Sequence, residues 1–341
     1  MIYDAFLFFN ELDLLKIRLE ELKDVVDRFV LVEAPLTFSG ASKPLYFELY
    51  RDIFSEYGDR IAHYVVPDMP RFARTSRYIR QFHQRNSIGT ALERAGCKPD
   101  DLVLVSDVDE IPCGQRLPEA LSWLESNDLV IFEQTYHHYY VNNMREHNWL
   151  GSYACRYDFL QAFGPVHKLR YGKQTLRRTG VDLRKTAIEQ KYPRFPQGGW
   201  HLSWFGGPDA VLYKQQSYSQ SLKVPKANRR MPYIRFNTGL SKLVDDPGSK
   251  AGPGPAPPRN YDVGCELPRY LSENREFFAH FFEPLNAGEA GDDRTEWHDT
   301  GYNVRRHLYA RVELLIERCR RLFWDHFPRF TATLKRLLRL R

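Results

Sequence analysis

The sequence is poor in cysteine and has no long apolar run. Its five cysteines are spread over 341 residues, and no two of them form a Cys-x-x-Cys pair. This spacing argues against a disulfide framework or a zinc site, so we expect reduced thiols and a cytoplasmic protein. No segment reaches the length of a membrane span without charges, and residues 2–9 lack the basic region that opens a signal peptide.

An excess of charge of one sign is also missing outside the C-terminal end. The chain has 49 Lys and Arg against 43 Asp and Glu, a net charge of +6. Residues 301–341 alone hold 11 basic and 3 acidic residues, which leaves a net charge of −2 for the rest. We therefore expect no nucleic-acid partner. The mixture of basic and apolar residues predicts a helical C-terminal extension over residues 286–341. It either lies on an anionic membrane surface or packs on the body.

Short apolar runs alternate with amphipathic stretches in the first half of the chain. This pattern predicts an α/β domain over residues 1–285, with a mainly parallel central sheet flanked by helices. Weaker alternation at residues 136–140 and 152–157 predicts antiparallel edge strands, and the proline- and glycine-rich residues 247–260 predict a loop. The predicted strands are residues 6–9, 28–32, 61–66, 102–105 and 129–132, and the predicted helices are residues 11–22, 78–95 and 118–125.

The acidic run Ser106-Asp107-Val108-Asp109-Glu110-Ile111-Pro112 follows a predicted buried strand. In α/β sheets, ligands bind beyond this end of the strands. Carboxylates at Asp107 and Asp109 suit Mn²⁺ or Mg²⁺, which would offset the charge on a departing diphosphate. We predict Asp109 as the main metal ligand and Asp107 as a metal and donor ligand. The alternative is a solvated acidic turn, because short Asp-x-Asp patterns often occur by chance.

A second motif is Gly198-Gly199-Trp200-His201-Leu202-Ser203-Trp204. His201 is a candidate third metal ligand. Trp200 and Trp204 are candidate acceptor-binding residues, because an aromatic ring can pack on the apolar face of a sugar. The alternative is a glycine turn that leads into an aromatic core strand.

Two carboxylates are candidates for the catalytic base. Asp209 precedes a helical stretch and could deprotonate an acceptor hydroxyl, although capping of that helix is the alternative. Glu110 is the second candidate. The candidate donor-binding residues lie at predicted strand ends or on helices close to the motifs, and each could instead be a cap or an ion-pair partner: Asn10, Glu11, Glu33, Arg85 and Lys214.

Taken in order, several motifs resemble glycosyltransferase family 17. The resemblance spans about residues 3 to 282 and departs from the family at Leu202, where a cysteine is common. The matching motifs are Phe9-Asn10-Glu11-Leu12-Asp13-Leu14-Leu15 with Arg18 and Glu21-Leu22, Glu33 with Thr37, Gly40 and Lys43-Pro44-Leu45, the acidic run from Asp107 to Pro112, Gly199-Trp200-His201 with Ser203-Trp204, and Pro268-x-Tyr270-Leu271-x-x-Asn274.

The resemblance implies a GT-A-like fold and metal-dependent, inverting transfer of N-acetylglucosamine from UDP-GlcNAc. It makes Asp107 and Asp109 the donor and metal carboxylates. The N-terminal membrane anchor of the Golgi members is missing, so we expect a bacterial member that is cytoplasmic or peripheral on the inner face of the cell membrane. Its acceptor would be a glycan, a polysaccharide or a lipid-linked saccharide. A metal-dependent phosphohydrolase and a catalytically silent sugar-binding protein are the alternative functions.

Overall fold

The computed structural model describes residues 1–71, 76–141, 144–171, 191–206, 210, 213–214, 216–217 and 267–282, without the side chains of residues 145–147 and 171. Contacts group the chain into two units, Met1–Glu289 and Ala290–Arg341. The second unit, the predicted loop at 247–260 and the predicted helical extension at 286–341 lie outside the described residues. The domain boundary at residue 285 therefore stays a prediction.

The centre of the first unit is an eight-stranded mixed sheet with the strand order β3-β2-β1-β4-β7-β6-β8-β5. Neighbouring strands from β3 to β4 run parallel. Strand β7 is antiparallel to both β4 and β6, β6 is parallel to β8, and β5 is antiparallel to β8. The strands are β1 (Ile2–Phe8), β2 (Arg28–Glu33), β3 (Ile61–Val65), β4 (Leu102–Asp107), β5 (Glu110–Pro112), β6 (Leu129–His138), β7 (Met144–Arg156) and β8 (Arg194–Ser203).

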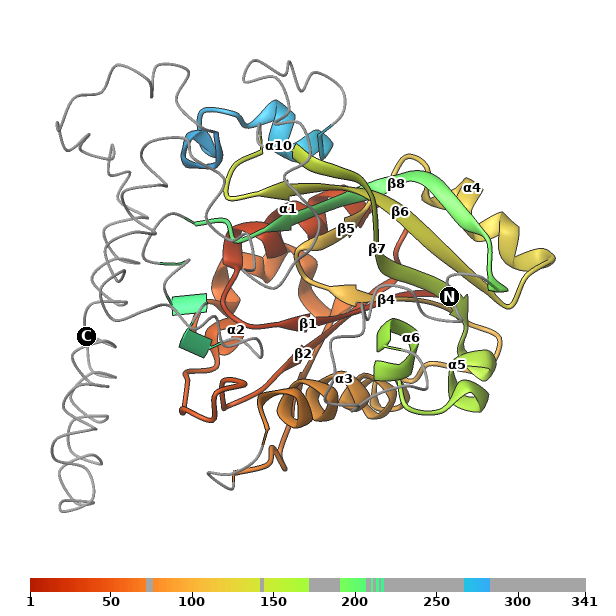
Figure 1. The fold of residues 1–341 in the computed structure, drawn as a ribbon, viewed down its shortest axis with the longest axis horizontal. Helices are drawn as coiled ribbons and strands as arrows, with labels where there is room; N and C mark the ends of the chain where they lie inside the picture. The colour runs from red at the N-terminus through yellow and green to blue at the C-terminus, as the bar shows by residue number, and fades with distance from the viewer. Residues whose placement is uncertain are drawn as a thin grey trace, which may run out of the picture. The chain divides into compact units, whose positions relative to one another are not determined.

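Helices cover both faces of this sheet. Figure 1 shows α3 on one side of the parallel strands and α1 on the other. The helices of the described residues are α1 (Leu12–Leu22), α2 (Tyr46–Leu49), η1 (Arg51–Arg60), α3 (Arg77–Arg94), α4 (Leu117–Ser122), η2 (Trp123–Glu125), α5 (Tyr157–Phe163), α6 (His167–Tyr171), α10 (Arg269–Glu273) and η5 (Ala279–Phe281).

The core follows from the alternation of side chains along each strand. In β1, Leu7 packs in one cluster with Ile88 of α3, whereas Phe6 packs in another cluster with Leu15 of α1. Successive strand residues point to opposite faces, so a strand that is apolar throughout must be covered on both sides. The continuous apolar runs of the sequence are therefore the interior strands of a three-layer α/β domain.

The predicted helix-flanked α/β fold is confirmed, with one difference in where the antiparallel strands lie. Residues 129–138 form a single strand, β6, and its partner β7 lies between β4 and β6 instead of at an edge. The edges are β3 and β5. The weak alternation at these positions is therefore that of interior strands, one of which, β6, carries irregular pairing with β7 and β8.

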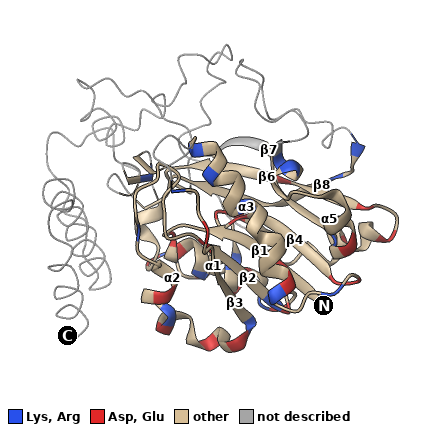
Figure 2. Ribbon diagram, turned by 90° about the horizontal axis from the view of Figure 1, so that it is seen from below, with Lys and Arg blue, Asp and Glu red and all other residues tan. Residues whose placement is uncertain are grey.

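Two observations concern the surface of the described ranges. Acidic and basic residues are interspersed along the ribbon in Figure 2, as expected for a body of nearly balanced charge. No helix in these ranges is both long enough and apolar enough to cross a membrane.

Candidate active site

The two motifs meet at the carboxyl end of β4. Asp107 is in register with Leu7 of β1. The residues after it form β5, which pairs with β8 so that Glu110 lies opposite His201. The backbone N–H of Leu202 also donates to the carbonyl oxygen of Asp109, with N and O 2.8 Å apart. The acidic run and the Gly-Gly-Trp-His segment are therefore neighbours in space, although about 90 residues of chain separate them.

The glycine at position 199 allows this close approach of β5 and β8. Gly199 has φ +142°, and a Cβ built on it would lie 2.1 Å from the carbonyl oxygen of Ile111. No other residue type fits without moving one of the two strands. The second glycine of the motif is thus required by strand pairing.

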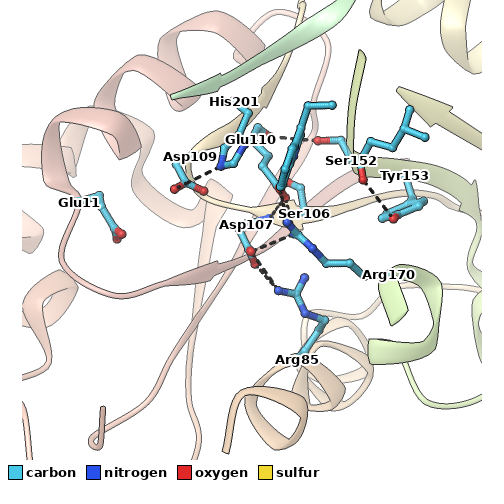
Figure 3. Close-up of polar contacts among 12 residues, drawn as sticks. Glu11, Arg85, Ser106, Asp107, Asp109, Glu110, Ser152, Tyr153, Arg170 and His201 are labelled. Atoms are coloured by element: carbon cyan, nitrogen blue, oxygen red, sulfur yellow. Dashed lines mark hydrogen bonds and ion pairs between the residues drawn. The ribbon is translucent and has the colours of Figure 1, made fainter. Parts of the chain in front are cut away.

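Asp107 is held by two arginines. Nη2 of Arg85, on α3, lies 2.7 and 2.9 Å from the two carboxylate oxygens. Nη1 of Arg170, on α6, lies 3.0 Å from Oδ2. Figure 3 shows both guanidinium groups converging on this carboxylate. Arg85 thus lies beside Asp107, and its donor contact stays a prediction, whereas no motif around Arg170 marked it in the sequence.

Glu110 is fully buried, and its carboxylate accepts four hydrogen bonds. Its donors are the backbone N–H of Asp107 at 2.9 Å, both Nη atoms of Arg170 at 2.9 and 2.6 Å, and the indole N–H of Trp149 at 2.8 Å. Burial favours the neutral acid, but the charge of Arg170 outweighs it and keeps the pKa of Glu110 below its usual range. Both oxygens of this ionised carboxylate already accept hydrogen bonds, so Glu110 stabilises the turn. This geometry does not suit the catalytic-base role predicted for Glu110.

A third arginine, Arg18, holds the backbone of this turn. Arg18 of α1 is completely buried, and its Nη1 donates to the carbonyl oxygens of Asp107 and Glu110 at 3.0 and 2.8 Å. Its Nε donates to Asp4 at 2.7 Å, and its Nη2 donates to Ser106 Oγ at 2.7 Å. Arg18 matched the family motifs, but nothing in the sequence indicated this role. The turn that presents Asp107 and Asp109 is therefore held through its backbone carbonyl groups as well as through its side chains.

Asp109 lies next to two nitrogen-bearing side chains. Lys214 Nζ is 2.9 Å from Asp109 Oδ2 and 3.4 Å from Glu11 Oε1, and His201 Nε2 is 3.8 Å from Asp109 Oδ2. Burial raises the pKa of Asp109, but the charge of Lys214 overcomes this and holds the pKa of Asp109 below its usual value. Asp109 is therefore a carboxylate at neutral pH. Lys214 lies beside it, and its donor contact stays a prediction.

His201 is buried between aromatic rings. Its ring centroid lies 4.8 Å from that of Tyr136 and 4.4 Å from that of Trp149. Burial lowers the pKa of His201 despite the nearby carboxylates. The imidazole is then neutral at pH 7, which is the form that can bind a metal.

The residues around Asp109 fit a divalent cation in part. Among the described residues, no group of three or more His, Cys, Asp and Glu side chains could hold a metal ion. A cation that accompanies a diphosphate needs fewer protein ligands, because phosphate oxygens and water complete its shell. Asp109, with His201 beside it, offers suitable donor atoms, whereas the carboxylate of Asp107 is already held by its two arginines.

Two other predicted donor residues lie at the end of β1. Asn10 is partly exposed. Glu11 accepts the backbone N–H groups of Phe9 and Asn10 at 3.3 and 3.0 Å and faces Lys214. Figure 3 shows Glu11 apart from the cluster around Asp107.

Glu33 has a different role from the donor contact predicted for it. It is fully buried and accepts hydrogen bonds from Lys43 Nζ at 2.8 Å and the backbone N–H of Tyr46 at 2.6 Å. His63 Nε2 lies 3.1 Å from its other oxygen. Glu33 thus anchors the loop before α2 and the start of that helix, because every oxygen is used inside the protein.

The two candidate tryptophans lie in different environments. Trp200 is 7% exposed and packs in a core cluster with Ile111 and Leu202, so the acceptor contact predicted for it does not fit. Trp204 follows the end of β8 and is partly exposed. The candidate base Asp209 lies outside the described residues and stays a prediction.

Comparison with known proteins gives matches in sequence. Residues 1–162 match the model of glycosyltransferase family 17. The β-1,4-mannosyl-glycoprotein 4-β-N-acetylglucosaminyltransferases of Rattus norvegicus and Homo sapiens are 26% and 25% identical to the chain over 297 residues. These matches cover 80% of this chain and 53% of each relative, so the chain spans about half the length of the curated relatives it matches.

Solved structures give weaker matches. A 4-diphosphocytidyl-2C-methyl-D-erythritol synthase from Anaerococcus prevotii is 12% identical, with a TM-score of 0.33 and coverage of 65% of this chain and 91% of the other. The glycosyltransferase GlyE of Streptococcus pneumoniae is 11% identical, with a TM-score of 0.32 and coverage of 57% and 45%. TM-scores this low carry no argument about fold or function. Residues 1–162, which include the acidic run, are thus similar to glycosyltransferase family 17, in line with the motifs of the sequence.

Proposed function

We propose that the protein is an inverting, metal-dependent glycosyltransferase that moves N-acetylglucosamine from UDP-GlcNAc to a hydroxyl group of a glycan or polysaccharide. The observation that carries this proposal is the pairing of β5 with β8, which brings Asp109 and His201 together where the parallel strands end. Ligands of α/β sheets bind at this edge. The family match over residues 1–162 supports the reaction class.

The charge of the site supports a role for Mn²⁺ or Mg²⁺. Among the described side chains at the site, four carboxylates face three cations, which leaves one negative charge. A diphosphate would therefore be repelled unless a cation accompanied it. A divalent cation reverses this balance and offsets the charge that develops on the leaving diphosphate. The carboxylates are Glu11, Asp107, Asp109 and Glu110, and the cations are Arg85, Arg170 and Lys214.

The residues then divide into three roles. Asp109, with His201, would hold the metal, and Lys214 lies close enough to Asp109 to contact donor phosphate. Asp107 is fixed in direction by its arginines and would contact the donor sugar nucleotide. Glu110 positions Asp107 through the hydrogen bond from its backbone N–H.

Asp209 is proposed to deprotonate the acceptor hydroxyl, which would attack the anomeric carbon from the face opposite the diphosphate. A lipid-linked saccharide as acceptor, and a peripheral position on the inner face of the cell membrane through the basic residues 301–341, are part of the same proposal.

An activity panel tests this function. The purified chain is incubated with UDP-GlcNAc and, separately, with p-nitrophenyl phosphate, each with Mn²⁺ and with excess EDTA. We expect release of UDP from UDP-GlcNAc only with Mn²⁺, and none of the phosphate release expected of a phosphohydrolase. Phosphate-ester hydrolysis without UDP release would refute the transferase. If neither UDP nor phosphate were released under any condition and UDP did not bind, a sugar-binding protein would be favoured.

A further inference from the structure

Aromatic side chains on three neighbouring strands lie beside Asp109. Tyr136 of β6 and Trp149 of β7 stack with ring centroids 5.1 Å apart, and both pack against His201 of β8. Tyr136 and Trp149 are partly exposed. These two partly exposed residues therefore contact His201, whose Nε2 lies 3.8 Å from Oδ2 of the proposed metal carboxylate Asp109.

Trp204 extends the ring system past the end of β8. Its ring lies 6.2 Å from that of His138, which in turn lies 5.7 Å from that of Tyr136. Lys214 Nζ lies 5.9 Å from the centroid of Trp204 and 2.9 Å from Asp109. The aromatic rings and the Lys214–Asp109 ion pair are thus successive neighbours, from His201 through Tyr136, His138 and Trp204 back to Asp109. We call Tyr136, Trp149 and Trp204 the aromatic wall.

The backbone beside the aromatic wall is held in an uncommon conformation. Trp204 has φ +64° and Tyr139 has φ +70°, and neither residue is a glycine. The two segments are tied together because the backbone N–H of Tyr139 donates to the carbonyl oxygen of Ser203 at 3.0 Å. Bulky residues with positive φ cost energy and persist where the surrounding structure or a function requires them.

Buried polar atoms without partners lie in the same strands. Both amide atoms of Gln134, two residues before Tyr136 on β6, are buried and accept or donate no hydrogen bond within the described part of the chain. The same holds for Nδ1 of His201, a side chain that is only 6% exposed. Unpaired buried polar groups are rare because each costs stability, and they call for an explanation such as a role in ligand binding.

We propose that the aromatic wall is a saccharide subsite that takes one pyranose ring of the acceptor beside Asp109. The apolar C–H face of a pyranose packs on an aromatic ring, while its hydroxyl groups form hydrogen bonds with polar groups around that ring. The assignment of this sugar to the acceptor rests on the proposed function. Binding of a saccharide to the wall can be measured without any transfer.

Saturation-transfer NMR on the full chain tests the subsite. The probes are the methyl β-glycosides of N-acetylglucosamine and mannose and the disaccharide chitobiose, added without donor or metal. We expect signals from at least one probe with the native protein. Trp204→Ala should weaken binding up to about tenfold, the upper range for loss of one aromatic contact. Trp204→Phe has the same positive φ but keeps a ring, so it should retain most of the binding.

Trp123→Phe is the matched control, because Trp123 packs against Phe195 away from the wall. It should bind the probes as the native protein does. Circular dichroism of each variant checks the fold. Unchanged binding in both Trp204→Ala and Tyr136→Ala overturns the subsite.

A parallel titration with UDP and Mn²⁺ separates this inference from the proposed function. UDP binding without any saccharide signal overturns the subsite and leaves the transferase intact. A saccharide signal lost on Trp204→Ala, with no UDP binding, supports the subsite and contradicts the transferase.

Discussion

Replacing Arg18 by methionine separates the stability of the fold from the geometry of the site. Asp4 and Arg18 are both completely buried and hydrogen-bonded to each other. Removing one partner of such a pair leaves an uncompensated charge, so Arg18→Met should lower the free energy of unfolding by about 3–5 kcal/mol. Urea unfolding followed by circular dichroism measures this change through a lower midpoint at unchanged slope.

The double variant Asp4→Leu, Arg18→Met removes the buried charge as well. Most of the lost stability should return, because an apolar pair of similar volume often replaces a buried ion pair without cost. In both variants the carbonyl oxygens of Asp107 and Glu110 lose their hydrogen bonds from Arg18, although Ser152 Oγ still donates to Glu110. Donor affinity, measured by titration with UDP and Mn²⁺, should therefore stay reduced in the double variant although the fold is restored.

The matched control is Arg156→Met, because Arg156 pairs with Asp100 at the surface and is 44% exposed. Exposed pairs contribute less than about 1 kcal/mol, so this variant should unfold and bind nearly as the native protein does. If donor affinity recovered together with stability in the double variant, Arg18 would have no role in holding the turn. A loss under 1 kcal/mol in Arg18→Met would refute the buried-pair argument itself.

Two further predictions concern strand pairing and acid stability. Gly199→Ala should destabilise the protein by more than about 2 kcal/mol in urea unfolding, because the added Cβ would lie 2.1 Å from a carbonyl oxygen. Gly89→Ala should instead stabilise α3 by about 0.5–1 kcal/mol, because a Cβ at this position has no other atom within 4 Å. Partial burial raises the pKa of Glu20, but the hydrogen bonds and charges of Lys23 and Lys16 lower it from 4.5 to about 2. The stabilisation that ionised Glu20 gives is present above pH 4.5 and is lost as the pH falls toward about 2. Glu20→Gln should therefore reduce the change in the free energy of unfolding over this pH range by about 1 kcal/mol, after solvent screening. An unchanged pH dependence in this variant would contradict the prediction.

The parts of the site that could be predicted lie next to strand ends. A buried apolar run followed by acidic residues places Asp107 and Asp109 at the ligand edge of a parallel sheet, and the structure has them there. Alternation along β8 carries a signal that sequence reasoning missed. Trp200 and Leu202 share the core face of that strand, so His201 must point the other way.

The rest of the site depends on contacts between distant parts of the chain. Arg170 reaches Glu110 across 60 residues, and Trp149 reaches it across 39. The sequence around neither position indicates a functional residue, because an arginine on a short helix and a tryptophan in a strand are common. The structural role of Glu33 was one of the alternatives that the sequence left open, and only the positions of Lys43 and α2 decide between them.

Asp109 is proposed to bind a metal that carries the donor diphosphate, and a calorimetric titration with UDP measures whether binding needs both the carboxylate and the metal. UDP is titrated into the native protein, Asp109→Asn and the surface control Asp100→Asn, each with Mn²⁺ and with EDTA. We predict Mn²⁺-dependent binding in the native protein and the control, and its loss in Asp109→Asn. Equal UDP affinity with Mn²⁺ and with EDTA, or native affinity in Asp109→Asn, would contradict the account.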